Sequence, residues 1–119
     1  MHKYIINEIP PSNNKFIGRT NFREYQRIKK YWAELLFYMC NPKPKKTIEK
    51  ATIELKYFFK DKQRRDPDNY SGKMVLDGLV KAGIIKDDSF NCIELKLCGL
   101  YDKENPRLEI TIEEKKQDV

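Results

Sequence analysis

Four aspartates form two short acidic motifs that lie about twenty residues apart in the middle of the chain. Asp66 and Asp68 flank Pro67, and Asp87 and Asp88 are consecutive. Carboxylate oxygens are the ligands that hard divalent cations such as Mg²⁺ prefer. The aspartates are therefore the residues from which a metal site acting on a polyanion could be built.

The stretch between the two motifs predicts how they would meet. Residues 70–82 have the apolar spacing of an amphipathic helix, and Gly83 follows the last apolar turn as a usual helix stop. Ile84 and Ile85 would then re-enter the core and carry the second acidic pair back towards the first. We therefore expect all four aspartates to lie together and to hold a metal ion.

The basic residues next to the first acidic pair could bind a phosphate group. Arg64 and Arg65 precede the pair, and Lys73 lies one turn into the predicted helix, within reach of a scissile phosphate. The chemistry that this set supports is phosphodiester hydrolysis, in which a divalent ion lowers the pKa of a bound water. A structural interpretation of Lys73 is an i,i+4 pair with Asp77, which we expect to be a helix-surface residue.

The acidic residues also have a purely structural interpretation. Asp68 or Asn69 could cap the following helix through a side-chain oxygen, and Asp87 and Asp88 could form an ordinary turn. In that case the chain is a non-catalytic nucleic-acid-binding module. A third hypothesis is a small interaction protein whose basic loops keep it soluble.

Composition limits the classes to consider. The 119 residues fit one domain, and 24 Lys and Arg against 18 Asp and Glu give a net charge of +6, which favours a nucleic-acid partner. No apolar run reaches the ~20 residues of a membrane span, and the N-terminus lacks a signal-peptide core, so we expect a cytoplasmic protein. Three cysteines without CxxC spacing fit free thiols in a reducing compartment. One histidine, His2, is too few for a zinc site.

Hydrophobic periodicity predicts the elements that would position these residues. Alternating patterns predict strands at residues 3–9, 47–60, 90–100 and 108–112. Helical spacing predicts one helix of about twenty residues between an N-cap at Asn21 and Asn41, and a second at 70–82. We therefore expect an α+β domain spanning 1–119, with two helices packed on a four-stranded mixed sheet in the order β-α-β-α-β-β.

Two segments resemble the signature of the RusA family of Holliday junction resolvases. Residues 64–90, RRDPDNYSGKMVLDGLVKAGIIKDDSF, contain an R-x-D-x-D-N motif, a helix with a Lys and a later Asp, and a D-D pair after an apolar turn. Residues 10–14, PPSNN, resemble the family's N-terminal P-P-S-x-N loop. The resemblance implies a homodimeric, Mg²⁺-dependent endonuclease, with Mn²⁺ as an alternative ion. Such enzymes bind four-way DNA junctions by shape and nick two opposing strands symmetrically in DNA recombination and repair, and their genes are typical of phages and prophages.

The resemblance also implies roles for individual acidic and basic residues. Asp66 and Asp68 match the paired metal-binding aspartates, Asp88 matches the essential later aspartate, and Asp87 is its acidic neighbour. Lys73 matches the catalytic helix lysine only if one extra residue is allowed in 70–72. The implied catalytic set is therefore Asp66, Asp68, Asp88 and Lys73.

Candidate DNA contacts come from both segments. Asn69 matches the motif asparagine and Asn14 the loop asparagine, whereas Lys15 and Arg19 are our own predictions from their place beside that loop. Arg64 and Arg65 complete the predicted DNA-binding set.

A homodimer is also expected on symmetry grounds. A four-way junction has two-fold symmetry, and one chain with one acidic cluster cannot cut two strands at once. The predicted third strand and the first helix are the candidate interfaces.

Overall fold

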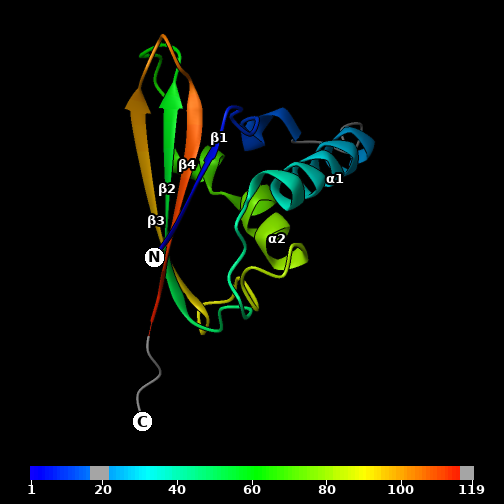
Figure 1. The fold of residues 1–119 in the computed structure, drawn as a ribbon. Helices are drawn as coiled ribbons and strands as arrows, with labels where there is room; N and C mark the ends of the chain where they lie inside the picture. Colours follow the sequence, from blue (N-terminus) through cyan, green and yellow to red (C-terminus); the bar gives the residue numbers. More distant parts are fainter. Residues whose placement is uncertain (17–21, 116–119) are drawn as a thin grey trace.

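The computed structural model describes residues 1–16 and 22–115, and Figure 1 shows that they form a sheet with the helices packed on one face. The elements in chain order are β1 (His2–Ile6), the 3₁₀ helix η1 (Asn13–Phe16), α1 (Phe22–Met39), β2 (Ala51–Phe59), the 3₁₀ helix η3 (Pro67–Tyr70), α2 (Lys73–Lys81), β3 (Ile93–Tyr101) and β4 (Arg107–Glu114). The α+β class and the order β-α-β-α-β-β are confirmed. The predicted N-cap at Asn21 and the predicted DNA contact at Arg19 lie outside the described residues.

The sheet is mixed, and its strand order is β1-β4-β2-β3. Strand β4 runs antiparallel to both β1 and β2, whereas β2 and β3 are parallel and are joined by the crossover through α2. Phe59 pairs with Tyr101 at the last position of the parallel ladder. The carboxyl ends of β2 and β3 therefore lie at the same edge of the sheet.

Several predicted boundaries are wrong by a few residues. Strand β1 ends at Ile6, β2 begins at Ala51, and α2 begins at Lys73 rather than at residue 70. The late start of α2 follows from Gly72, whose φ of 83° is left-handed and separates the helix from η3. A Cβ at this glycine would also come 2.5 Å from Leu55 Cδ1, so the Leu55 side chain would have to shift to admit a larger residue.

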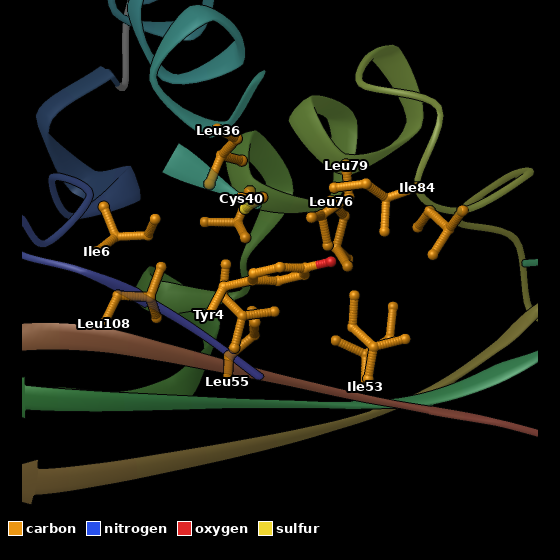
Figure 2. Packing of buried hydrophobic residues seen from close by; sticks show 14 of the residues in the cluster. Tyr4, Ile6, Leu36, Cys40, Ile53, Leu55, Leu76, Leu79, Ile84 and Leu108 are labelled. Carbon is orange, nitrogen blue, oxygen red and sulfur yellow. The ribbon is translucent and has the colours of Figure 1, made fainter. Parts of the chain in front are cut away.

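The hydrophobic core lies between the helix layer and one face of the sheet, as Figure 2 shows. In β2 the predicted alternation is confirmed, with Ile53 and Leu55 fully buried and Glu54 on the opposite face. Burying a side chain of this size contributes about 1.5–3 kcal/mol relative to leaving it exposed. The strands are therefore fixed to the helices by their apolar faces.

Glycine brings the two helices together and ends the second one. A Cβ at Gly78 would come 2.5 Å from Leu36 Cδ1, so this residue allows α2 to approach α1 closely. At the other end, the N–H of Gly83 donates to the Val80 carbonyl and the N–H of Ile84 donates to the Leu79 carbonyl, both at 3.0 Å. This left-handed glycine cap confirms the predicted helix stop.

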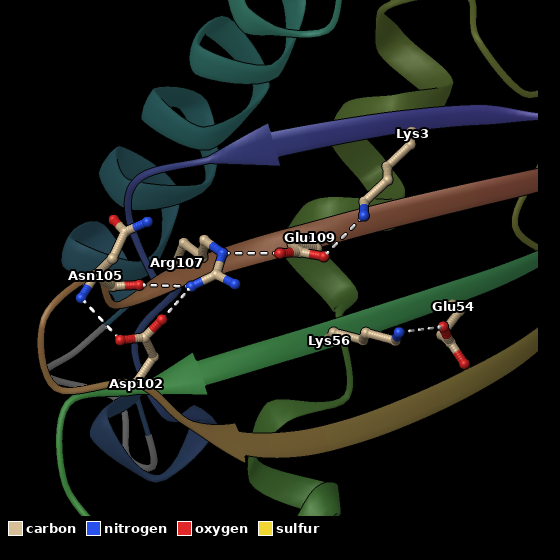
Figure 3. A network of polar contacts seen from close by, with 7 residues as sticks. All are labelled: Lys3, Glu54, Lys56, Asp102, Asn105, Arg107 and Glu109. Carbon is tan, nitrogen blue, oxygen red and sulfur yellow. Dashed lines mark hydrogen bonds and ion pairs between the residues drawn. The ribbon is translucent and has the colours of Figure 1, made fainter.

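The other face of the sheet carries a polar network, shown in Figure 3. Arg107 donates to the carboxylates of Asp102 and Glu109, in both cases at 2.7 Å, and Lys3 pairs with Glu109 at 3.3 Å. The hydrogen bond from Arg107 lowers the pKa of the Asp102 carboxyl below its ordinary value. The network ties the β3–β4 turn to β4.

A membrane span is not found: no helix in the described part of the chain is long and apolar enough to cross a bilayer.

Candidate nuclease site

The first acidic pair lies on η3, close to the carboxyl ends of β2 and β3. Asp66 is the residue before this 3₁₀ helix and has extended backbone angles, and its carbonyl accepts the Asn69 N–H at 3.0 Å. Its carboxylate pairs with Arg64 at 3.3 Å and makes no capping bond. The N-cap of α2 is Gly72, so the interpretation in which Asp68 or Asn69 caps that helix is wrong.

The N-terminal loop is tied directly to this acidic motif. The Asn13 amide donates to the Asp68 carbonyl at 3.0 Å and to the Ser71 hydroxyl at 3.1 Å. Between the two segments runs an open groove of about 480 Å³. The predicted site residues that line it are Asn14, Arg64, Arg65, Asp66 and Asn69. The structure therefore brings together residues that lie about fifty positions apart in the sequence.

The two arginines of the motif have different surroundings. The Arg64 side chain is 89% exposed, whereas that of Arg65 is only 18% exposed. Arg65 pairs with the Asp61 carboxylate at 2.8 Å, donates to the Gln63 carbonyl at 3.0 Å, and lies 4.2 Å above the Phe59 ring. The geometry thus favours Arg64 as the phosphate contact, because the donors of Arg65 already hold the loop.

Lys73 is the first residue of α2 and is fixed by Asp77. The Asp77 carboxylate lies 3.4 Å from the Lys73 ammonium and 3.4 Å from that of Lys29, which comes from α1. The expectation that Asp77 is a surface residue is wrong, because α1 packs over it and its side chain is only 18% exposed. Asp77, with a smaller effect from Asp88, raises the pKa of Lys73, which therefore remains an ammonium. Sequence reasoning missed Lys29, since no local pattern links it to α2.

The second acidic pair lies in the loop between α2 and β3. The bridge between Ile48 and Ile85, and the Lys86 N–H donated to the Ile48 carbonyl at 2.9 Å, fix this segment near the start of β2. Asp88 nevertheless contributes to the raised pKa of Lys73 at the start of α2. Within residues 1–16 and 22–115, no three acidic, histidine or cysteine side chains form a group that could hold a metal ion.

The sequence matches one family model, described as Endodeoxyribonuclease RusA, over residues 13–113. This match runs from η1 into β4 and contains the groove and both acidic pairs. The chain belongs to the RusA family. No curated protein matches it. Membership makes the chain part of a family of hydrolases that cut DNA internally and act in Holliday junction resolution, which confirms the resemblance seen in the two motifs.

RusA-family nucleases are typically metal-dependent, and carboxylates are the ligands that hard divalent cations prefer. Mg²⁺ is commonly held by only one or two carboxylates, together with water and substrate phosphates. Asp66 is half exposed and lies one residue from Asp68, on the groove where a phosphate would be bound. The donor chemistry therefore fits Mg²⁺ or Mn²⁺ at the first pair, while the full set of four aspartates is not assembled in this structure.

Proposed function

We propose that this RusA-family protein is a Mg²⁺-dependent endodeoxyribonuclease that resolves four-way DNA junctions during recombination and repair. The observation that carries the proposal is the shared groove, in which the exposed Arg64 and the loop asparagine Asn14 lie beside Asp66. Phosphate-binding groups and carboxylates on one surface are what metal-assisted phosphodiester hydrolysis needs.

Each predicted residue has a role in this proposal. Asp66 and Asp68, with Asp87 and Asp88 completing the set when DNA is bound, would hold the ion, which activates a water and offsets charge on the leaving oxygen. Lys73 would contact the scissile phosphate through the ammonium that Asp77 holds in place. Arg64, Asn14, Lys15, Arg19 and Asn69 would hold the flanking phosphates.

A homodimer would supply the two sites that symmetric paired nicks require. Two surfaces expose large apolar side chains that a second copy could cover. On α1 they are Phe22, Tyr31, Phe37, Tyr38 and Met39, and on the edge strand β3 they are Leu95, Leu100 and Tyr101. Both candidate interfaces from the sequence are thus retained in the proposal.

The proposal is tested with a labelled synthetic four-way junction, incubated with protein in the presence and absence of Mg²⁺. Wild-type protein should produce paired nicks only with Mg²⁺, and Asp68→Asn should still shift the junction on a native gel without nicking it. A linear duplex of the same sequence is the control substrate. Binding that is indifferent to Mg²⁺, with no nicks from wild type under any condition, would favour the non-catalytic binding module instead.

A further inference from the structure

An apolar cavity of about 80 Å³ opens beside Asp66, on the helix-covered face of the sheet. It lies at the carboxyl ends of the parallel strands β2 and β3, which is where open sheets with parallel strands commonly bind ligands. Its walls are Tyr57 and Phe59 of β2, Tyr70 of η3, and Leu97 and Gly99 of β3. The cavity has several times the roughly 10–15 Å³ that one water needs, so it suits one small planar ring.

The aromatic walls are preformed. The rings of Tyr57 and Phe59 are stacked 5.9 Å apart with an angle of 7° between their planes, and the Tyr70 ring meets Phe59 edge-on at 5.0 Å. The guanidinium of Arg65 adds a planar cation 4.2 Å from the centre of the Phe59 ring. Aromatic rings and guanidinium planes are the surfaces on which unstacked bases are held.

Glycine leaves the cavity open on the β3 side. Gly99 pairs with Tyr57 in the parallel ladder, and a Cβ placed on it would meet only the Phe59 ring, at an ordinary contact distance of 3.7 Å. Its φ is not positive, so the backbone does not require glycine here. A larger side chain at this position would occupy the cavity without straining the strand.

The cavity borders the groove of the candidate nuclease site, because the two share lining residues. The residues that line both are Arg65, Asp66 and Tyr70. A DNA strand whose phosphate lies at Asp66 would therefore have a neighbouring base next to the aromatic walls. Bases at a branch point lose stacking partners, which lowers the energy needed to turn one outward.

We propose that this cavity binds one unstacked nucleobase of the strand whose phosphate lies at Asp66. The inference rests on the proposed function, since it takes DNA to be the substrate. The base next to the cut is then a part of what the protein recognises, in addition to the phosphates held along the groove.

The experiment places the fluorescent base 2-aminopurine at successive positions around the branch point and measures binding without Mg²⁺. One position next to the cut should change fluorescence on binding wild type, because its base enters the cavity. Gly99→Val, which fills the cavity, should abolish that change, whereas Gly99→Ala should retain it. An abasic nucleotide at that position should weaken wild-type binding about tenfold or more and should leave Gly99→Val binding unaffected.

Circular dichroism should show whether Gly99→Val is folded, and Tyr70→Leu provides a second variant that removes a ring from the wall. Equal fluorescence changes in wild type and both variants, or no change at any position near the branch, would overturn the base-binding proposal. That failure is distinct from failure of the proposed function, because Mg²⁺-dependent nicking by wild type is measured separately. Absence of all nicking would instead overturn the nuclease proposal.

Discussion

Asp77 orients the Lys73 side chain and further stabilises its ammonium form. One largely buried carboxylate receives this ammonium and that of Lys29 from the neighbouring helix, so it links the candidate site to the packing of α1 on α2. In the proposed site, Lys73 would contact the phosphate, and Asp77 would hold Lys73 in place without contacting the phosphate itself. From the sequence alone, the i,i+4 spacing of Lys73 and Asp77 predicts only a weak ion pair on the helix surface.

Asp77→Asn should lower both stability and nicking. Removing the shared carboxylate leaves two ammonium groups without their partner, which for a partly buried pair costs about 1–2 kcal/mol. The nicking rate should fall about tenfold if Lys73 loses its orientation, a loss of roughly 1.4 kcal/mol in transition-state stabilisation. Urea unfolding and junction cleavage measure the two effects. Lys29→Met is the matched control, which should lower stability but spare nicking; equal cleavage losses in both variants would contradict the positioning role.

The two arginines of the motif should differ in how they affect DNA binding. Each phosphate contact contributes about 0.9 to the slope of log K against log salt on duplex arms. Arg64→Ala should flatten that slope by about one unit, because its side chain is exposed on the groove. Arg65→Ala should instead lower the melting temperature, since it removes bonds to Asp61 and Gln63. Titrations at several salt concentrations measure the slopes, and identical slopes for wild type and Arg64→Ala would rule out the phosphate contact.

At the scale of elements, local sequence patterns are sufficient to predict a helix or strand when one of its faces is buried. The alternation in β2 and the glycine after α2 predicted both elements correctly, because burial and left-handed backbone leave direct marks in the sequence. The start of α2 was misplaced because Gly72 interrupts an apolar pattern that continues on both sides of it.

The position of the second acidic pair could not be predicted from local sequence. It depends on the bridge between Ile48 and Ile85, which joins segments 37 residues apart. The groove at η3 depends in the same way on Asn13, which bonds across 55 residues to Asp68. The sequence therefore predicts candidate site residues, while long-range contacts decide which of these candidates lie together.

The β3–β4 turn should make stability depend on pH through Asp102. Arg107 lowers the pKa of this carboxyl in the folded protein, so the stability it contributes is fully present above the unfolded value of 3.8. That contribution is lost as the pH falls below 3.8 and through the folded-state pKa. Asp102→Asn should therefore be less stable than wild type at pH 7, and the two should converge in strong acid. Urea unfolding from pH 7 to about pH 2.5 tests this, and a constant difference would contradict the ion pair's contribution.

At the scale of the whole molecule, the helix layer covers one face of the sheet, and the other face carries ion pairs between charged side chains (Figures 1 and 3). The candidate groove, the aromatic cavity and α2 all lie on the helix side. The excess of basic over acidic residues, +6 overall, would draw a polyanion towards the protein before specific contacts form. The acidic motif is thus a local region of opposite charge, to which a divalent cation would be attracted.

Mg²⁺ should raise the melting temperature of the DNA-free protein if the aspartates hold it. A ligand that binds only the folded chain stabilises it by RT ln(1 + [L]/Kd), or about 2.7 kcal/mol at 100 times Kd. For a chain of this size that corresponds to an increase of roughly 10 °C. The Asp66→Asn/Asp68→Asn double variant should lose the increase, and NaCl at matched ionic strength controls for general screening. Equal increases in wild type and this variant would exclude the first pair as ligands.

The second acidic pair requires its own variant, because it lies in a different loop from the first. Asp87→Asn/Asp88→Asn should reduce the Mg²⁺-induced increase if the ion draws both pairs together, since fewer carboxylates then bind it. An unchanged increase would assign the ion in the free protein to Asp66 and Asp68 alone. In that case Asp87 and Asp88 would act only once DNA is bound, and the same variant should still lose nicking of the junction while its melting temperature responds to Mg²⁺ like that of wild type.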